Sequence, residues 1–183
     1  MLRGMFIFMK AFQRIMDGIT SVVDRCVSFS FWAAAVLLFF LGPIAFYEVV
    51  VRKLGHPTTW TFHILVYSQL FMIWFGVAYT QKVRGHVNVD IITRLLPLTV
   101  RIITRIFAYL VCQVISLILI WQSWVMIKRS YVYKLMTTEE FLHPIYWLQI
   151  PTLIGAVLLF LVFFCQTYKD ITWLFTREGP PAE

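Results

Sequence analysis

The sequence predicts an all-α integral membrane protein, in which an amphipathic helix at the membrane surface precedes four transmembrane helices. Of its 183 residues, 60% are hydrophobic and 14% are charged, whereas soluble domains average about 45–50% apolar and about 25% charged residues. Four apolar runs have at least the ~20 residues that a helix needs to cross ~30 Å of hydrocarbon. None of them shows the alternation of a membrane barrel strand. We therefore expect lipid, not water, to surround most of the chain.

The N-terminal segment is expected to lie in the headgroup plane. From Met5 to Val23, apolar side chains recur at every third or fourth position, while Lys10, Arg14 and Asp17 occupy the other face. This separation of polar and apolar faces is typical of helices at a membrane interface. Packing on a partner helix is the alternative. Because no short apolar core ends in a small-residue cleavage site, we do not expect a cleaved signal peptide.

Four helical spans follow this segment. Helices are expected because every backbone group in hydrocarbon must find its hydrogen-bond partner within the segment. The spans are Val27–Val51, Trp60–Val83, Ile102–Ile127 and Ile145–Cys165. With no repeat or linker, the chain divides into an amphipathic helix (1–25), one four-helix membrane domain (26–174) and a cytoplasmic tail (175–183).

The distribution of Lys and Arg near the helix ends predicts the orientation in the membrane, because basic residues accumulate on the cytoplasmic side. The side that holds both termini has eleven of these residues and the other side has five. Both termini and the loop after the second span are therefore expected in the cytoplasm. The five residues on the other side are Arg52, Lys53, Lys128, Arg129 and Lys134.

The formal net charge of +7 would suggest a nucleic-acid partner in a soluble protein. Here the basic residues stand at the ends of apolar runs, so membrane lipids are the expected partners and nucleic acid is not. The cysteines Cys26, Cys112 and Cys165 are widely spaced and form no CxxC pair. We interpret them as small buried apolar side chains, without a zinc site or a disulfide.

Few charged residues lie inside the spans. Glu48 and Arg52 are four residues apart, so they can pair across one helical turn, either as an interfacial ion pair or as a contact with another subunit. The main polar residues inside the other spans suit helix–helix hydrogen bonds; they are Gln69, Gln113, Gln122 and Ser116. A solute carrier would need intramembrane charges or broken helices with liganding groups, and no catalytic motif occurs. We expect neither transport by the chain alone nor an enzyme.

Histidines raise the alternative of a haem-bearing or structural membrane-anchor subunit of a respiratory enzyme. His63 and His143 both fall near the outer face and could ligate one haem. His143 adjoins a proline in a loop, however, and no second histidine lies inside a span at the depth of His63. Glu140 and His143 have the spacing of half a di-iron site, but no second copy occurs. The residues therefore predict no cofactor and no metal.

The hexapeptide GHVNVD (85–90) follows the second span. His86 and Asp90 would share one face of a helix, but further metal ligands are missing nearby in the sequence. A membrane-surface turn explains the residue types equally well, because Gly85 can end the span and Asp90 can cap the next helical segment.

The order of motifs along Val27–Leu174 resembles the DctQ-like small permease subunit of tripartite ATP-independent periplasmic (TRAP) transporters. The hexapeptide is its most specific part, together with the proline and tryptophan between the first two spans. Members of this family often carry a Glu two or three residues after that tryptophan, where this chain has Phe62 and His63, so His63 could make a pH-dependent contact instead. The matching residues are Arg52, Gly55, Pro57, Trp60, Gly76, Ala78, Tyr79, Gly85, His86, Asp90, Pro151, Gly155 and Gln166.

The resemblance implies a division of labour in the bacterial inner membrane. A large permease subunit would bind the solute and sodium, and a periplasmic solute-binding protein would deliver an organic acid. The small subunit would serve as a scaffold in this sodium-gradient-driven import and would bind no cofactor itself. Its subunit-interface or structural positions are expected to include Glu48, Arg52, Pro57, Trp60, His63, Gly85, His86 and Asp90.

Overall fold

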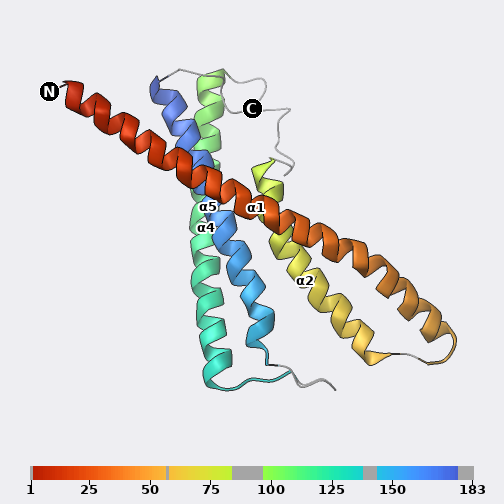
Figure 1. Ribbon diagram of the computed structural model, residues 1–183. Helices are drawn as coiled ribbons and strands as arrows, with labels where there is room; N and C mark the ends of the chain where they lie inside the picture. The colour runs from red at the N-terminus through yellow and green to blue at the C-terminus, as the bar shows by residue number, and fades with distance from the viewer. Residues whose placement is uncertain (1, 57, 84–96, 138–143, 177–183) are drawn as a thin grey trace.

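Four helices make up the part of the chain that the structure describes, and each contains a stretch long and apolar enough to cross a membrane. This confirms the all-helical class and the four spans. The computed structural model describes residues 2–56, 58–83, 97–137 and 144–176. The helices in Figure 1 are α1 (Leu2–Lys53), α2 (Thr59–Lys82), α4 (Leu98–Val132) and α5 (Tyr146–Thr176).

Helix α1 is one uninterrupted helix of 52 residues. The sequence predicted a separate amphipathic helix before residue 25, but the structure has no break there. Neither Gly nor Pro occurs between Gly18 and Gly42, so nothing in this stretch disfavours helix propagation. The helix also continues through Pro43. The N-terminal segment is thus helical, and its place in the headgroup plane remains a prediction.

Helix α1 ends in a tight turn at Gly55. Gly55 has a φ of 85°, a left-handed conformation that glycine adopts without a steric penalty. The Gly55 amide donates to the Arg52 carbonyl and the His56 amide donates to the Val51 carbonyl, both at 3.1 Å. This is the hydrogen-bond pattern of a Schellman motif, which satisfies the last free carbonyls of a helix.

The helices form two hairpins that pack through α2 and α5. Helix α1 packs on α2, α4 packs on α5, and α2 joins the two pairs by packing on α5. Figure 1 shows α4 and α5 running side by side, while α1 crosses them at a steep inclination. The end of α1 and the beginning of α2 lie apart from the end of α4 and the beginning of α5 at the lower end of this view, so the two hairpins diverge in that direction.

Helix α4 contacts α5 through a regular seam. Its buried residues recur at every seventh position, and three of the five are serines. A seven-residue repeat keeps one stripe of a helix facing its neighbour with a slight left-handed twist, and small side chains let two membrane helices approach closely. The seam consists of Ile102, Tyr109, Ser116, Ser123 and Ser130.

The contact between α2 and α5 is equally close. Gly155 of α5 lies against Trp74 of α2, where an added Cβ would stand 2.6 Å from the Trp74 carbonyl oxygen. Ala78 and Ala156, near this contact in the two helices, are both fully buried. Small residues therefore set the distance between the two hairpins, as is common in membrane helix pairs.

The three cysteines differ in burial. Cys165 belongs to the hydrophobic core, Cys112 is partly buried, and Cys26 is exposed on α1. The interpretation of all three as buried apolar side chains is therefore wrong for Cys26. The three thiols are free.

Large apolar side chains cover the outer faces of α1 and α4. Their exposed fractions reach 77% at Phe29 and 72% at Trp121. Soluble monomers rarely expose continuous apolar surfaces of this extent, so lipid or another membrane subunit must cover these faces. Further examples are Trp32, Phe39, Phe46, Phe107, Ile118 and Trp124.

Candidate functional site

Polar contacts between helices are concentrated where α2 and α5 end and where α4 begins. The strongest joins Arg105 of α4 to Asp170 of α5. The Arg105 Nε donates to Asp170 Oδ2 and its Nη2 donates to Oδ1, both at 2.6 Å. Asp170 is 1% exposed, and Arg105 is 18% exposed. A bidentate Arg–carboxylate pair fixes geometry as well as charge, so it sets the register of α4 against α5.

This ion pair was missed from the sequence. The predicted third span began at Ile102 and the fourth ended at Cys165, whereas α4 begins at Leu98 and α5 continues to Thr176. Asp170 therefore lies on the last part of α5, beyond the predicted end of the fourth span. Its spacing of four residues from Gln166 was the available signal, because the two polar groups must share one helix face.

Amide side chains add a second contact at the same end of the bundle. Gln81 of α2 donates through Nε2 to Gln166 Oε1 at 2.8 Å, and Gln166 Nε2 donates to the Gln81 carbonyl at 3.0 Å. On the other side of α5, Gln113 Nε2 donates to Thr167 Oγ1 at 3.2 Å. The structure confirms the predicted helix–helix hydrogen bond of Gln113. Helix α5 is thus bonded to α2 and α4 through side chains. Ser116, predicted for the same role, instead donates to the Cys112 carbonyl of its own helix at 2.8 Å, and Gln69 and Gln122 are exposed.

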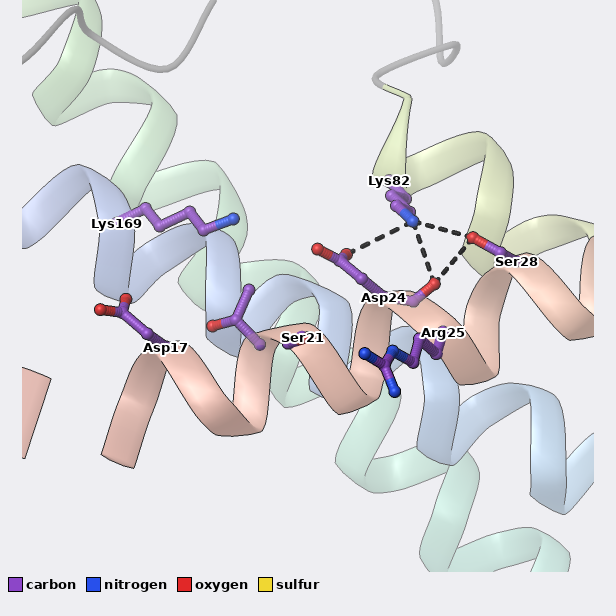
Figure 2. A pocket seen from close by; sticks show the side chains of 8 residues that line it. Asp17, Ser21, Asp24, Arg25, Ser28, Lys82 and Lys169 are labelled. Carbon is purple, nitrogen blue, oxygen red and sulfur yellow. Dashed lines mark hydrogen bonds and ion pairs between the residues drawn. The ribbon is translucent and has the colours of Figure 1, made fainter. Parts of the chain in front are cut away.

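Lys82 connects α2 to α1. Its Nζ donates to the Asp24 carbonyl and to Ser28 Oγ, both at 3.0 Å, and lies 3.5 Å from Asp24 Oδ1. Figure 2 shows these contacts at one edge of a pocket between α1, α2 and α5. All four helices are therefore connected by polar groups at one end of the bundle.

A different cluster holds the α1–α2 turn at the opposite end. Glu48 is 6% exposed and accepts a hydrogen bond at 3.1 Å from Arg52, which confirms the predicted pairing across one helical turn. The other carboxylate oxygen accepts from the Thr58 hydroxyl, and Thr58 Oγ1 is 2.6 Å from Thr61 Oγ1. Thr58 occupies the N-cap position of α2 but makes no side-chain cap, because its hydroxyl bonds to Glu48 instead.

Two further predicted positions lie on the first turns of α2. Trp60 is 43% exposed, and its ring centroid is 6.1 Å from that of Tyr47 on α1. His63 is partly buried and stacks on Tyr67 with ring centroids 5.9 Å apart. The structure thus gathers Glu48, Trp60 and the threonines around one turn, and places His63 on the adjoining part of α2.

The remaining predicted positions, Pro57, Gly85, His86 and Asp90, lie outside the described residues, and so do Glu140 and His143. Within the described part of the chain, no three His, Cys, Asp or Glu side chains come together in the way a metal site requires. The surface-turn interpretation of GHVNVD therefore remains a prediction.

The polar groups of the bundle bond mainly to one another. Among the described residues, only Gln149 Oε1 is a buried side-chain oxygen or nitrogen without a hydrogen-bond partner. Buried polar groups that are mutually satisfied fix helix positions, whereas an ion or solute site needs liganding groups that are free to accept the cargo. The arrangement is thus chemically suited to holding four helices in place.

Comparison with known proteins identifies one family. The sequence model described as "Tripartite ATP-independent periplasmic transporters, DctQ component" matches residues 41–172. The match covers the last part of α1, all of α2 and α4, and α5 up to residue 172. No curated protein matches the chain.

Proposed function

Because the chain belongs to the family of DctQ components of tripartite ATP-independent periplasmic transporters, we propose that it is the scaffold of a sodium-gradient-driven importer of an organic acid. A small membrane subunit of such a transporter is a component of a transport machine and not an enzyme. In our proposal, a large permease subunit carries the solute- and sodium-binding groups, and a periplasmic solute-binding protein delivers the solute. This chain holds the large subunit in the inner membrane.

The mutual bonding of the interhelical polar groups is the observation that supports this division of labour. Arg105 neutralises Asp170, Gln81 bonds to Gln166, and Lys82 bonds to α1. A carrier that alternates between two states needs cargo-binding groups near the midplane. The described helices instead place their paired groups between helices and leave broad aromatic faces on α1 and α4 exposed. Such faces suit contact with lipid and with another membrane subunit.

We further propose that both termini face the cytoplasm. The proposal rests on the excess of Lys and Arg at that end of the helices. In Figure 1 the beginning of α1, the end of α5 and the beginning of α4 lie toward the same end of the molecule, as an even number of spans requires. The Glu48 cluster then lies on the periplasmic side, at the level where a solute-binding protein docks.

Reconstitution in liposomes tests the scaffold role. We expect no saturable sodium-dependent uptake of C4-dicarboxylates, keto acids, sugar acids or sulfonates by this chain alone. Adding the large subunit and the binding protein from the same transporter should restore uptake of one of these classes. Liposomes with the large subunit and binding protein but without this chain are the matched control. Saturable uptake by the isolated chain, or full activity without it, would contradict the proposal.

A further inference from the structure

A pocket of about 570 Å³ lies between α1, α2 and α5, at the end of the bundle that carries the interhelical polar contacts. Its lining combines two acids, Asp17 and Asp24, with three bases, Arg25, Lys82 and Lys169. In Figure 2 the side chains of Asp24 and Lys169 point into the space between α1 and α5. A pocket with both signs of charge suits a ligand that also carries both.

The lining groups differ in how far the protein itself satisfies them. Lys82 bonds to the Asp24 carbonyl and to Ser28. The side chains of Lys169 and Asp17, on facing parts of α5 and α1, make no hydrogen bond or ion pair with any other described residue. One cation and one carboxylate of the pocket are therefore available to a ligand.

The stripe of α1 that lines the pocket becomes apolar immediately beyond it. Asp17, Ser21, Asp24 and Ser28 follow the three- and four-residue spacing of one helix face. The same face continues with apolar residues, of which Trp32 is 67% exposed and Phe39 is 73% exposed. A polar pocket that leads into an exposed apolar stripe matches the shape of an amphiphile. The apolar continuation consists of Trp32, Ala35 and Phe39.

We propose that this pocket binds the headgroup of a phospholipid that carries phosphoethanolamine, with its acyl chains along the apolar stripe of α1. Lys169 faces the phosphate together with Lys82, which lines the same pocket from α2, because basic residues between membrane helices bind lipid phosphates. Asp17 and Asp24 accept hydrogen bonds from the ammonium group, which offers three donors. A headgroup with a phosphate alone would leave the Asp17 carboxylate unpaired beside a second negative charge.

Lipid retention by the purified protein tests the proposal. The full-length chain is extracted from membranes with the proteins that copurify, and bound phosphatidylethanolamine and phosphatidylglycerol are quantified by native mass spectrometry. Lys169→Gln and Asp17→Asn are compared with Lys128→Gln, which removes an exposed charge near the other end of α4. Thermal unfolding of each variant checks that it is folded. Since the side chains of Lys169 and Asp17 make no hydrogen bond or ion pair with other described residues, we expect Lys169→Gln and Asp17→Asn to unfold at temperatures close to that of the wild type.

We expect wild type and Lys128→Gln to retain phosphatidylethanolamine in preference to phosphatidylglycerol. Lys169→Gln should lower its retention about ten-fold, the effect of losing one charge-assisted hydrogen bond. Asp17→Asn should remove the preference between the two lipids. Equal retention in all variants, or no preference in the wild type, would overturn the proposal.

Two further experiments distinguish a lipid headgroup from a soluble phosphate ester and from a contact with another protein. Soluble phosphoethanolamine at millimolar concentration should not displace the lipid, and displacement would make the ligand a soluble phosphate ester. A photocrosslinking residue in place of Ser21 should label lipid. Labelling of a copurifying protein instead would show that the pocket is a subunit contact and that the lipid assignment is wrong.

Discussion

Arg105 and Asp170 are 65 positions apart in sequence, yet their side chains form a bidentate ion pair with two N–O distances of 2.6 Å. The pair lies between the first turns of α4 and the last turns of α5, and its carboxylate is almost fully buried. The Asp170 carboxylate is tolerable in this position only with its cation, because the loss of Arg105 would leave it uncompensated in a poorly hydrated environment.

Asp170→Ala is therefore expected to destabilise the protein strongly, by about 3 kcal/mol, because a partly buried Arg105 loses its partner. Replacing both residues by leucine should cost less than Asp170→Ala alone. Thermal unfolding in detergent, followed by circular dichroism, measures both effects. Arg129→Gln, which changes an exposed charge on the same helix, serves as the control. A loss for Asp170→Ala no larger than that of the control would show that the pair is unimportant for stability.

The close approach of α2 and α5 predicts opposite effects for two glycines. Gly155→Ala places a methyl group 2.6 Å from the Trp74 carbonyl, and such overpacking costs about 1–3 kcal/mol. Gly76→Ala meets nothing within 4 Å and should be neutral or stabilise by up to about 1 kcal/mol through helix propensity. The unfolding temperature of Gly155→Ala should thus lie below that of the wild type, and that of Gly76→Ala should lie at or above it. The same change in both would mean that the helices are farther apart than described.

Glu48 is expected to contribute more to the stability of the protein than its basic partner Arg52. Its carboxylate accepts hydrogen bonds from Arg52 and Thr58, so Glu48→Ala should loosen the α1–α2 turn and lower the unfolding temperature. Arg52→Gln should cost at most about 1 kcal/mol, because the Arg52 side chain is largely exposed. Limited proteolysis at the turn gives a second readout. If Arg52→Gln were the more damaging change, the arginine would instead be engaged by another subunit.

Cysteine labelling tests the orientation. In a background without native cysteines, single substitutions Arg3→Cys, Asn88→Cys and Pro180→Cys should react with a membrane-impermeant maleimide only after the cells are opened. A cysteine in place of His56, at the α1–α2 turn, should react in intact cells. The reason is the asymmetry of basic residues between the two sides. Reaction of any of the first three in intact cells would contradict the predicted topology.

The GHVNVD prediction rests on sequence alone. Asp90→Asn retains the ability to cap a helix and should behave like the wild type, whereas Asp90→Ala should cost about 0.5–2 kcal/mol. Neither variant, nor His86→Ala, should change metal content or the sodium dependence of uptake by the assembled transporter. Elemental analysis and uptake assays measure both. Loss of a stoichiometric metal in Asp90→Asn would show that the hexapeptide is a chemical site.

The four spans were predictable because their length and apolar character are properties of single segments. The Glu48–Arg52 pair was predictable for the same reason, since four residues define one helical turn. The Arg105–Asp170 pair depends on how α4 and α5 are aligned, and 65 positions in sequence, including the connection between the two helices, separate Arg105 from Asp170. Sequence patterns within one segment do not predict how two distant helices are aligned. Arg105 was therefore used only as one of the basic residues that predict the orientation in the membrane.

The α4 seam could have been recognised. Tyr109, Ser116, Ser123 and Ser130 repeat at intervals of seven residues, and a repeat of small polar residues within an apolar run predicts the face that meets another helix. The continuity of α1 was also readable from the absence of Gly and Pro between residues 19 and 41. The change from an amphipathic to an apolar pattern near Arg25 suggested a boundary, but a change of environment along a helix does not require a break in it.

The length of α1 has a geometric consequence for the membrane. A helix of 52 residues is about 78 Å long at 1.5 Å per residue, more than twice the ~30 Å hydrocarbon thickness. Helix α1 is strongly inclined to α4 and α5 in Figure 1. A chain of 21.6 kDa therefore extends far to one side of the α4–α5 pair. The protein therefore has a long lateral surface for its mass, along which lipid or another membrane subunit can make contact.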